Sequence, residues 1–415
     1  MPCETAVDDM IPAPIYLDHN ATTPVLPEVV EAMLPWLGGR FGNPSSGHGF
    51  GAEAKRAVER SREQVAELLA ARADEIVFTS GGTEANNLAI RGYAEGRADR
   101  GGTIVIGAVE HPSVAECAAW LVRRGPLVGK PATPALCSGG QMCVALGGAW
   151  ETILLPVDGD GRVDPDAART AVGPKTVMVS VMHAQNEVGT LQPIREIAAT
   201  AHERGVVVHT DAAQSVGKIP TRVDDLGVDL LTIAGHKLYA PKGVGALYVR
   251  RGVTLAPVLV GAGHERGLRP GTENVTGIVG LGAACEIARK TMDVEAARQR
   301  VLCDALWDLL RSGVPGLRRT GHPTERLPNT LHVIFPGVRG AAVLAAAPEV
   351  AATTGSACHE GSETPSAVLQ TMGVANDAAL GAVRLSLGRG TTRADVERAA
   401  GALVRASAAV AAARP

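Results

Sequence analysis

The chain has 415 residues, of which 46% are hydrophobic, and its 40 Lys and Arg nearly balance 43 Asp and Glu to give a formal net charge of −3. Such a chain is long enough for two or three domains with a large core, and its composition excludes intrinsic disorder. The charge balance argues against a nucleic-acid-binding or membrane-surface protein, and no apolar run reaches the ~18 residues that span a bilayer.

The cysteines and the first residues bear on the compartment. Seven cysteines are scattered through the chain, which suits a reducing environment better than a disulfide scaffold. The first residues lack the basic and apolar segments of a secretory signal. We therefore expect a cytoplasmic enzyme.

In chain order, apolar residues at helical spacing alternate with short β-branched runs. Helices are predicted at residues 27–37, 51–71, 163–172, 194–203, 276–288, 295–310 and 392–413, with others beginning near 82 and 113. Strands are predicted at 75–80, 103–107, 152–157, 176–182, 206–211, 230–234, 244–250, 329–335, 350–354 and 382–387. The alternation between about 75 and 250 predicts an α/β fold with a mostly parallel, doubly wound sheet. The later elements predict a smaller domain.

Residues 125–150 interrupt this alternation. They are rich in Gly and Pro and show no period, so we expect a surface insertion of irregular chain. Cys137 and Cys143 lie within it. Because no further Cys or His follows nearby, free thiols are favoured over a metal site.

Polar residues follow two neighbouring predicted strands. Asp211 and Gln214 come after the strand that opens at residue 206, and His236 and Lys237 come after the next strand. Ligands of open α/β sheets bind outside the carboxyl ends of the strands, so these four side chains should converge. A Lys that forms a Schiff base and an Asp that pairs with a pyridinium nitrogen suit pyridoxal 5′-phosphate (PLP). A simple Lys–Asp ion pair with a structural His remains the alternative on these segments alone.

Two further strand ends carry candidate residues. Gly81, Gly82 and Thr83 lie where a strand turns into a helix, so an anion could approach the backbone N–H groups at the helix N-terminus. Taken alone this is an ordinary capped turn, but beside a Schiff-base lysine it predicts a phosphate site. His111 follows the strand at 103–107, where an imidazole could stack on a cofactor ring.

With these motifs in place, the chain resembles the cysteine desulfurases, PLP enzymes of the fold-type I aminotransferase class, and their relatives the selenocysteine lyases. The resemblance covers nearly all of residues 15–405 except the insertion. The matching motifs are LDHNATTP (17–24), GNPSS (42–46), TSGGTE (79–84), EH (110–111), NEVG (186–189), HTDAAQ (209–214), GHK (235–237), RPGTEN (269–274), GSAC (355–358) and RLSLG (384–388).

The resemblance implies a fold and an assembly. It implies a large PLP-binding domain at residues 25–275 with a sheet of the seven-stranded type. Residues 1–24 and 276–415 would form a smaller α+β domain that carries a loop with Cys358. It also implies a homodimer, in which Thr272 would reach the cofactor phosphate of the partner subunit.

The resemblance also implies roles for site residues. Lys237 would bind PLP, Asp211 would hold its ring nitrogen, and Gln214 would hydrogen-bond its ring oxygen. His111 would stack on the ring as an acid or base, and Gly82, Thr83 and His236 would hold the phosphate. Arg384 and Asn186 would bind the substrate carboxylate, with Asn186 also near the cofactor.

The implied reaction converts L-cysteine to L-alanine. The Cys358 thiolate would take the sulfur as a persulfide and pass it to an acceptor protein, for iron–sulfur or other sulfur-containing products.

One position departs from the usual desulfurase pattern. Ala234 stands where these enzymes usually have a Ser that donates to the phosphate, two residues before His236. A lost neutral hydrogen bond is worth roughly 0.5–1.5 kcal/mol, so PLP should bind more weakly but still bind. An apolar residue here is similar to the selenocysteine lyases, so release of selenium from L-selenocysteine is the alternative activity.

Overall fold

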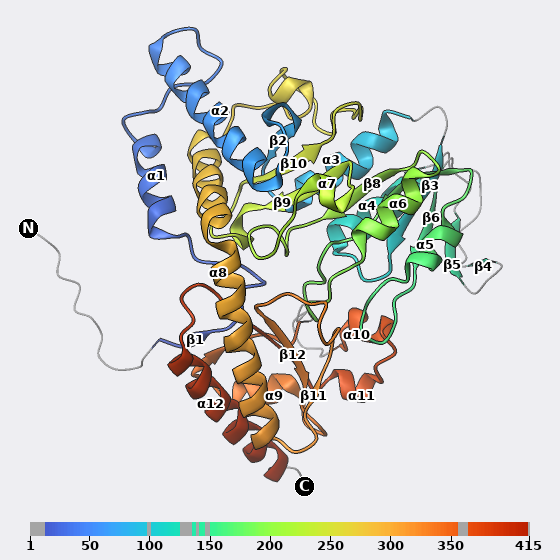
Figure 1. Ribbon diagram of the computed structural model, residues 1–415, viewed down its shortest axis with the longest axis vertical. Helices are drawn as coiled ribbons and strands as arrows, with labels where there is room; N and C mark the ends of the chain where they lie inside the picture. The colour runs from blue at the N-terminus through green and yellow to red at the C-terminus, as the bar shows by residue number, and fades with distance from the viewer. Residues whose placement is uncertain are drawn as a thin grey trace, which may run out of the picture.

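The computed structural model describes residues 13–97, 101–124, 135–137, 141–145, 150–355 and 364–413 (Figure 1). Its largest element is a nine-stranded sheet in the order β2-β10-β9-β8-β7-β3-β6-β5-β4. Its strands are β2 (Ile76–Thr79), β3 (Gly102–Gly107), β4 (Ala135–Cys137), β5 (Gln141–Ala145), β6 (Trp150–Leu155), β7 (Thr176–Ser180), β8 (Val207–Asp211), β9 (Leu230–Ala234) and β10 (Gly245–Val249). From β9 to β6 the neighbours are parallel, and β10 is antiparallel to β2 and β9. The predicted mostly parallel sheet is confirmed.

The prediction of irregular chain for residues 125–150 is wrong for the segments that form β4 and β5. These two segments form an antiparallel pair, and β5 pairs antiparallel with β6 in the register Val144↔Thr152. An edge strand needs hydrogen-bonding partners on one side only, so a segment without apolar alternation can still add to a sheet. Without β4 and β5, the sheet has the seven strands that the resemblance implies.

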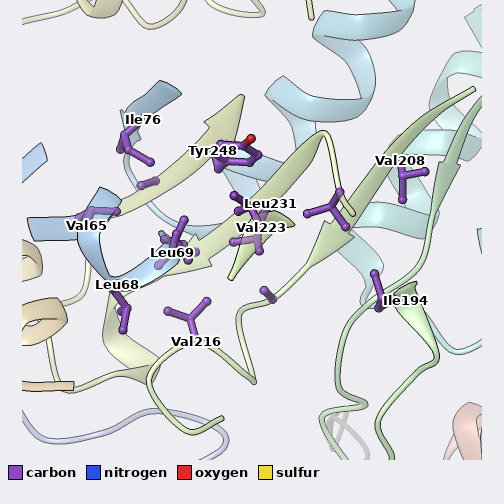
Figure 2. Close-up of a cluster of buried hydrophobic side chains, with 14 of the residues drawn as sticks. Val65, Leu68, Leu69, Ile76, Ile194, Val208, Val216, Val223, Leu231 and Tyr248 are labelled. Atoms are coloured by element: carbon purple, nitrogen blue, oxygen red, sulfur yellow. The ribbon is translucent and has the colours of Figure 1, made fainter. Parts of the chain in front are cut away.

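Helices cover both faces of the sheet, because the side chains of each strand alternate between faces. On β3, Ile104 and Ile106 pack into the core beneath α3 (Gly82–Glu95) and α4 (Pro112–Arg124), whereas Val105 belongs to the core on the other face. Figure 2 shows the core on that other face of the large sheet, where Val65 and Leu69 meet Ile76, Leu231 and Tyr248. The helices on this face are α2 (Gly49–Leu69), α5 (Pro165–Ala171), α6 (Ile194–His202) and α7 (Val223–Leu226).

One helix, α8 (Val275–Gly313), runs from the large sheet into a second core and packs against α1 (Pro27–Leu37) and α2 on the way (Figure 1). The two separate helices predicted at 276–288 and 295–310 are therefore wrong. Between Ala288 and Glu295 there is no Pro or Gly to break the backbone hydrogen bonds, so the helix continues.

The second core is built from both ends of the described chain. A three-stranded antiparallel sheet and a two-stranded parallel pair lie beside α8 and α12. On the basis of this shared core we propose residues 1–24 and 276–415 as the smaller domain and 25–275 as the larger. The elements of the smaller domain are β1 (Ile15–Tyr16), β11 (Arg318–Arg319), β12 (Thr330–Ile334), β13 (Val350–Ala351), β14 (Ala382–Ser386), α9 (Gly340–Ala345), α10 (Ala367–Thr371), α11 (Asn376–Ala379) and α12 (Arg393–Ala412). Among the helices described, none is long and apolar enough to cross a bilayer.

Candidate active site

A cavity of about 320 Å³ lies where the carboxyl ends of the parallel strands face the smaller domain. Most of the predicted site residues line it: Gly82, Thr83, His111, Asn186, Asp211, Gln214, His236, Lys237 and Arg384. Thr272 is exposed and is not among the lining residues. Cys358, with most of its loop, lies outside the described residues. The structure thus brings together residues that are far apart in the sequence, as the strand-end pattern predicted.

Lys237 lies in a short 3₁₀ turn, Gly235–Lys237, directly after β9. Burial lowers the pKa of its amine, whereas the neighbouring Asp211 raises it. A buried lysine with a lowered pKa is more readily the neutral amine that attacks carbonyl carbons. The Asp211 carboxylate accepts hydrogen bonds from the Ala213 N–H at 2.9 Å and the Asn86 Nδ2 at 2.8 Å.

A second carboxyl group, Glu110, lies behind the cavity. It accepts a hydrogen bond from the Met182 N–H at 2.7 Å, yet burial and the nearby Asp211 raise its pKa well above the usual value. The raised pKa favours the uncharged form of Glu110, whereas the Asp211 carboxylate is the charge that acts on the Lys237 amine.

The N-terminus of α3 provides the place for an anion. Its N-cap is Gly81, with a φ of 150° that favours glycine, and no side chain among the described residues caps it. A Cβ atom on Gly82 would lie 3.2 Å from the Ala234 Cβ, so this wall of the site is tight. His236 is hydrogen-bonded to Thr22 at 3.1 Å, and burial and nearby lysines lower its pKa to about 4, so its ring is neutral.

Arg384 on β14 closes the cavity from the smaller core. One of its Nη atoms lies 2.7 Å from Asp18, and the other donates to the Asn186 carbonyl oxygen at 2.9 Å. Its Nε is buried and has no hydrogen-bond partner within the described part of the chain. The guanidinium is therefore held in place, and its Nε–H is among the N–H groups left for a carboxylate.

Sequence reasoning missed several residues of the site. Asn86, on the second turn of α3, and Ser113, on the first turn of α4, also line the cavity. Lys218 lies behind it and donates to Asn20 at 3.0 Å and to Gln214 at 3.1 Å. Helical spacing could have found two of them, because Asn86 follows Gly82 by four residues and Lys218 follows Gln214 by four.

Comparisons with known proteins identify the family. The family model of the class-V aminotransferases matches residues 15–130 and 148–399, which is most of the chain. The chain is 46% identical over 388 residues to a cysteine desulfurase of Gluconacetobacter diazotrophicus, covering 92% of this chain and 91% of that protein. It is 42% identical over 384 residues to the cysteine desulfurase IscS of Dictyoglomus turgidum, with the same coverage. The chain belongs to the class-V aminotransferase family, among the cysteine desulfurases. This family uses PLP.

Solved structures agree with this assignment. A NifS-like protein matches with a TM-score of 0.83 and 34% identity, covering 94% of this chain and 98% of that one. A structure described as SspA in complex with cysteine matches with a TM-score of 0.75 and 33% identity, covering 90% and 98%. The family match breaks at residues 131–147, which contain both β4 and β5, so this hairpin is an addition to the family fold.

Proposed function

We propose that the protein is a PLP-dependent cysteine desulfurase that converts L-cysteine to L-alanine and passes the sulfur, as a persulfide on Cys358, to an acceptor protein. The observation that carries the proposal is the buried Lys237 beside Asp211 in a polar cavity, in a chain 46% identical to a cysteine desulfurase.

The residues of the cavity fit PLP. An amine, a carboxylate and an uncapped helix N-terminus match its aldehyde, ring nitrogen and phosphate, and the Asn86 Oδ1 and Arg384 Nε are buried polar atoms without partners among the described residues. When bound, PLP supplies an electron sink that weakens the Cβ–S bond of cysteine. We assign the ring to Lys237, Asp211, Gln214 and His111, and the phosphate to Gly82, Thr83 and His236.

The substrate carboxylate is assigned to Arg384 and Asn186. The Arg384 guanidinium is oriented by Asp18 and by the Asn186 carbonyl, which supports a fixed carboxylate position. The Lys237 amine would be the base that takes the proton from the substrate Cα.

Cys358 is the proposed sulfur acceptor. Its thiolate attacks the substrate sulfur, an S–S bond forms, the Cβ–S bond breaks, and the electron pair of that bond stays with the substrate carbon. A proton then added at this carbon completes alanine. The three cysteines with described side chains, Cys117, Cys285 and Cys303, are buried with raised thiol pKa values of about 12, 12 and 11, which makes them poor nucleophiles.

A homodimer is part of the proposal. Large apolar side chains are exposed along α1 and the segment after it, including Leu37 at 69% and Phe41 at 73%, and the Phe41 ring stacks on Phe50 with centroids 5.4 Å apart. Apolar groups gathered in this way favour a protein–protein contact. Thr272, exposed and away from its own cavity, is then available to the partner's phosphate site. Light scattering of Phe41→Glu should show a monomer if this contact forms the dimer.

The function is tested by measuring alanine and sulfide from L-cysteine with purified protein. We expect Lys237→Ala to lose both the visible cofactor absorbance and the activity. Cys358→Ser should keep the absorbance but lose sulfide release, whereas the matched control Cys117→Ser should keep activity. Full activity in Cys358→Ser would exclude the persulfide step.

Ala234 supports L-selenocysteine as a second candidate substrate. The ratio of kcat/KM for selenocysteine to that for cysteine decides between them. A ratio near one removes the selenium-selective alternative.

A further inference from the structure

A continuous chain of hydrogen bonds joins Asp211 to His111 through two residues that have no role in the proposal so far. Asn86, on the second turn of α3, places its Nδ2 2.8 Å from the Asp211 Oδ2 and 2.7 Å from the Ser113 Oγ. Ser113, on the first turn of α4, places its Oγ 2.8 Å and its backbone N 3.1 Å from the Nδ1 of His111. Asp211 and Asn86 are buried, and the chain lies in the wall of the cavity.

The directions of these bonds follow from the chemistry of the groups. The Asp211 carboxylate only accepts, so the NH₂ end of the Asn86 amide must face it. The same NH₂ group donates its second hydrogen to the Ser113 Oγ, which leaves the hydroxyl hydrogen free to donate to His111. The Ser113 backbone N–H can only donate, so the His111 Nδ1 must be the acceptor and carry no proton.

We propose that Asn86 and Ser113 are positioning residues that hold His111 as the neutral tautomer with its proton on Nε2, tied to the charge on Asp211. The Nε2–H is then the polar group left to His111 on the side of the ring away from Ser113. In this form His111 presents a hydrogen-bond donor at Nε2, and its unprotonated nitrogen, Nδ1, faces Ser113. The role of this tautomer in the reaction rests on the proposed PLP site, whereas the tautomer itself can be tested without PLP.

The charges around His111 are consistent with a neutral ring. Burial lowers its pKa most strongly, the Asp211 carboxylate raises it, and the Lys237 ammonium lowers it. The two hydrogen-bond donors that face Nδ1 lower the pKa of His111 further, because a proton on Nδ1 would point at the Ser113 N–H.

The experiment uses full-length protein labelled with ¹⁵N-histidine, prepared both without and with PLP. Long-range ¹H–¹⁵N correlation spectra identify the protonated ring nitrogen, and the signal absent from His111→Gln is that of His111. We expect an unprotonated Nδ1 in both preparations. In Ser113→Ala the pKa of His111 should rise by about half a unit to one unit, the effect of one net hydrogen bond.

Matched variants separate positioning from folding. Ser113→Thr keeps the hydroxyl and should restore the wild-type pKa. Asn86→Leu should raise the pKa as Ser113→Ala does, whereas Asn87→Leu, at the next and partly exposed position of α3, should not. A protonated Nδ1 in the wild-type protein overturns the proposal, and so does an unchanged pKa in Asn86→Leu and Ser113→Ala. If Asn86→Leu does not fold, Ser113→Ala and Ser113→Thr decide. Because the PLP-free spectra do not depend on turnover, they remain valid if the desulfurase activity is disproved.

Discussion

Asp18 and Arg384 form an ion pair with a separation of 2.7 Å that ties the N-terminal segment to strand β14 beside the cavity. The Arg384 side chain is 7% exposed and that of Asp18 22%, so water screens the pair only in part. The pair fixes the direction in which the guanidinium presents its Nε–H.

Asp18→Asn should therefore impair substrate binding more than turnover. A hydrogen bond to a charged group is worth roughly 1.5–3 kcal/mol, and at the lower end KM for L-cysteine rises about 10-fold with a smaller change in kcat. Steady-state alanine formation measures both. Glu397→Gln, which breaks the exposed pair with Arg393 on α12, is the control and should change neither. An unchanged KM in Asp18→Asn would show that Asp18 does not orient Arg384.

Lys218 should affect cofactor binding although it does not line the cavity. It donates to the Gln214 Oε1, while the Gln214 Nε2 donates to the Asn20 carbonyl oxygen at 3.0 Å, so the amide has one orientation. In Lys218→Met this constraint is lost, and we expect PLP to bind about 5- to 30-fold more weakly, as for a loss of 1–2 kcal/mol. Equilibrium dialysis against PLP gives the affinity. Lys290→Met, at an exposed helix position, should bind PLP normally; equal affinities in the two variants would contradict the role of Lys218.

Ala234→Ser should strengthen PLP binding. The position lies at the end of β9 against Gly82, where a hydroxyl could donate to the phosphate. One neutral hydrogen bond corresponds to roughly 2- to 10-fold in affinity. The same dialysis experiment tests it, with Ala256→Ser, outside the cavity, as the control. Weaker binding in Ala234→Ser would mean that the tight wall at Gly82 leaves no room for the hydroxyl.

Glu187 should make stability fall as pH rises. It is buried and accepts a hydrogen bond from Ser366 at 2.6 Å, and desolvation raises its pKa from 4.5 to about 7. Between these two values the folded state binds more protons than the unfolded state. Its contribution to stability is therefore complete below pH 4.5 and is lost as pH rises through about 7, by about 3 kcal/mol at most.

Glu187→Gln removes this titration. We expect its urea midpoint to change less between pH 5 and pH 8 than that of the wild type, with a gain in relative stability at pH 8. Glu116→Gln, at an exposed position on α4, is the control and should follow the wild type. Parallel pH profiles for wild type and Glu187→Gln would mean that Glu187 stays ionised in the folded protein.

Local pattern was enough to predict most of the sheet and several of the residues that line the cavity. The strands that end at Asp211 and Ala234 are mostly β-branched or apolar, and a parallel sheet must bring their carboxyl ends to one edge. The helix at Pro27–Leu37 was predicted to the residue because Pro opens it and two glycines follow it.

The missed features depend on contacts that no local pattern contains. The β4–β5 hairpin pairs with the free edge of β6, and Ser113 meets Asn86 only because α3 and α4 pack side by side. The length of α8 was missed because the polar stretch around Lys290 and Asp293 interrupts the apolar spacing without breaking the helix. A gap in hydrophobic periodicity marks a change of packing partner here, from one core to the other.

That unbroken α8 has a mechanical consequence. Its 39 residues span about 58 Å, with buried residues such as Leu281 in the core of the large sheet and Leu306 in the core of the smaller domain. Neither core can unfold without removing its side chains from their packing against α8. Heating should therefore produce one cooperative calorimetric endotherm for the whole subunit, and a proline placed at Thr291 should split it into two.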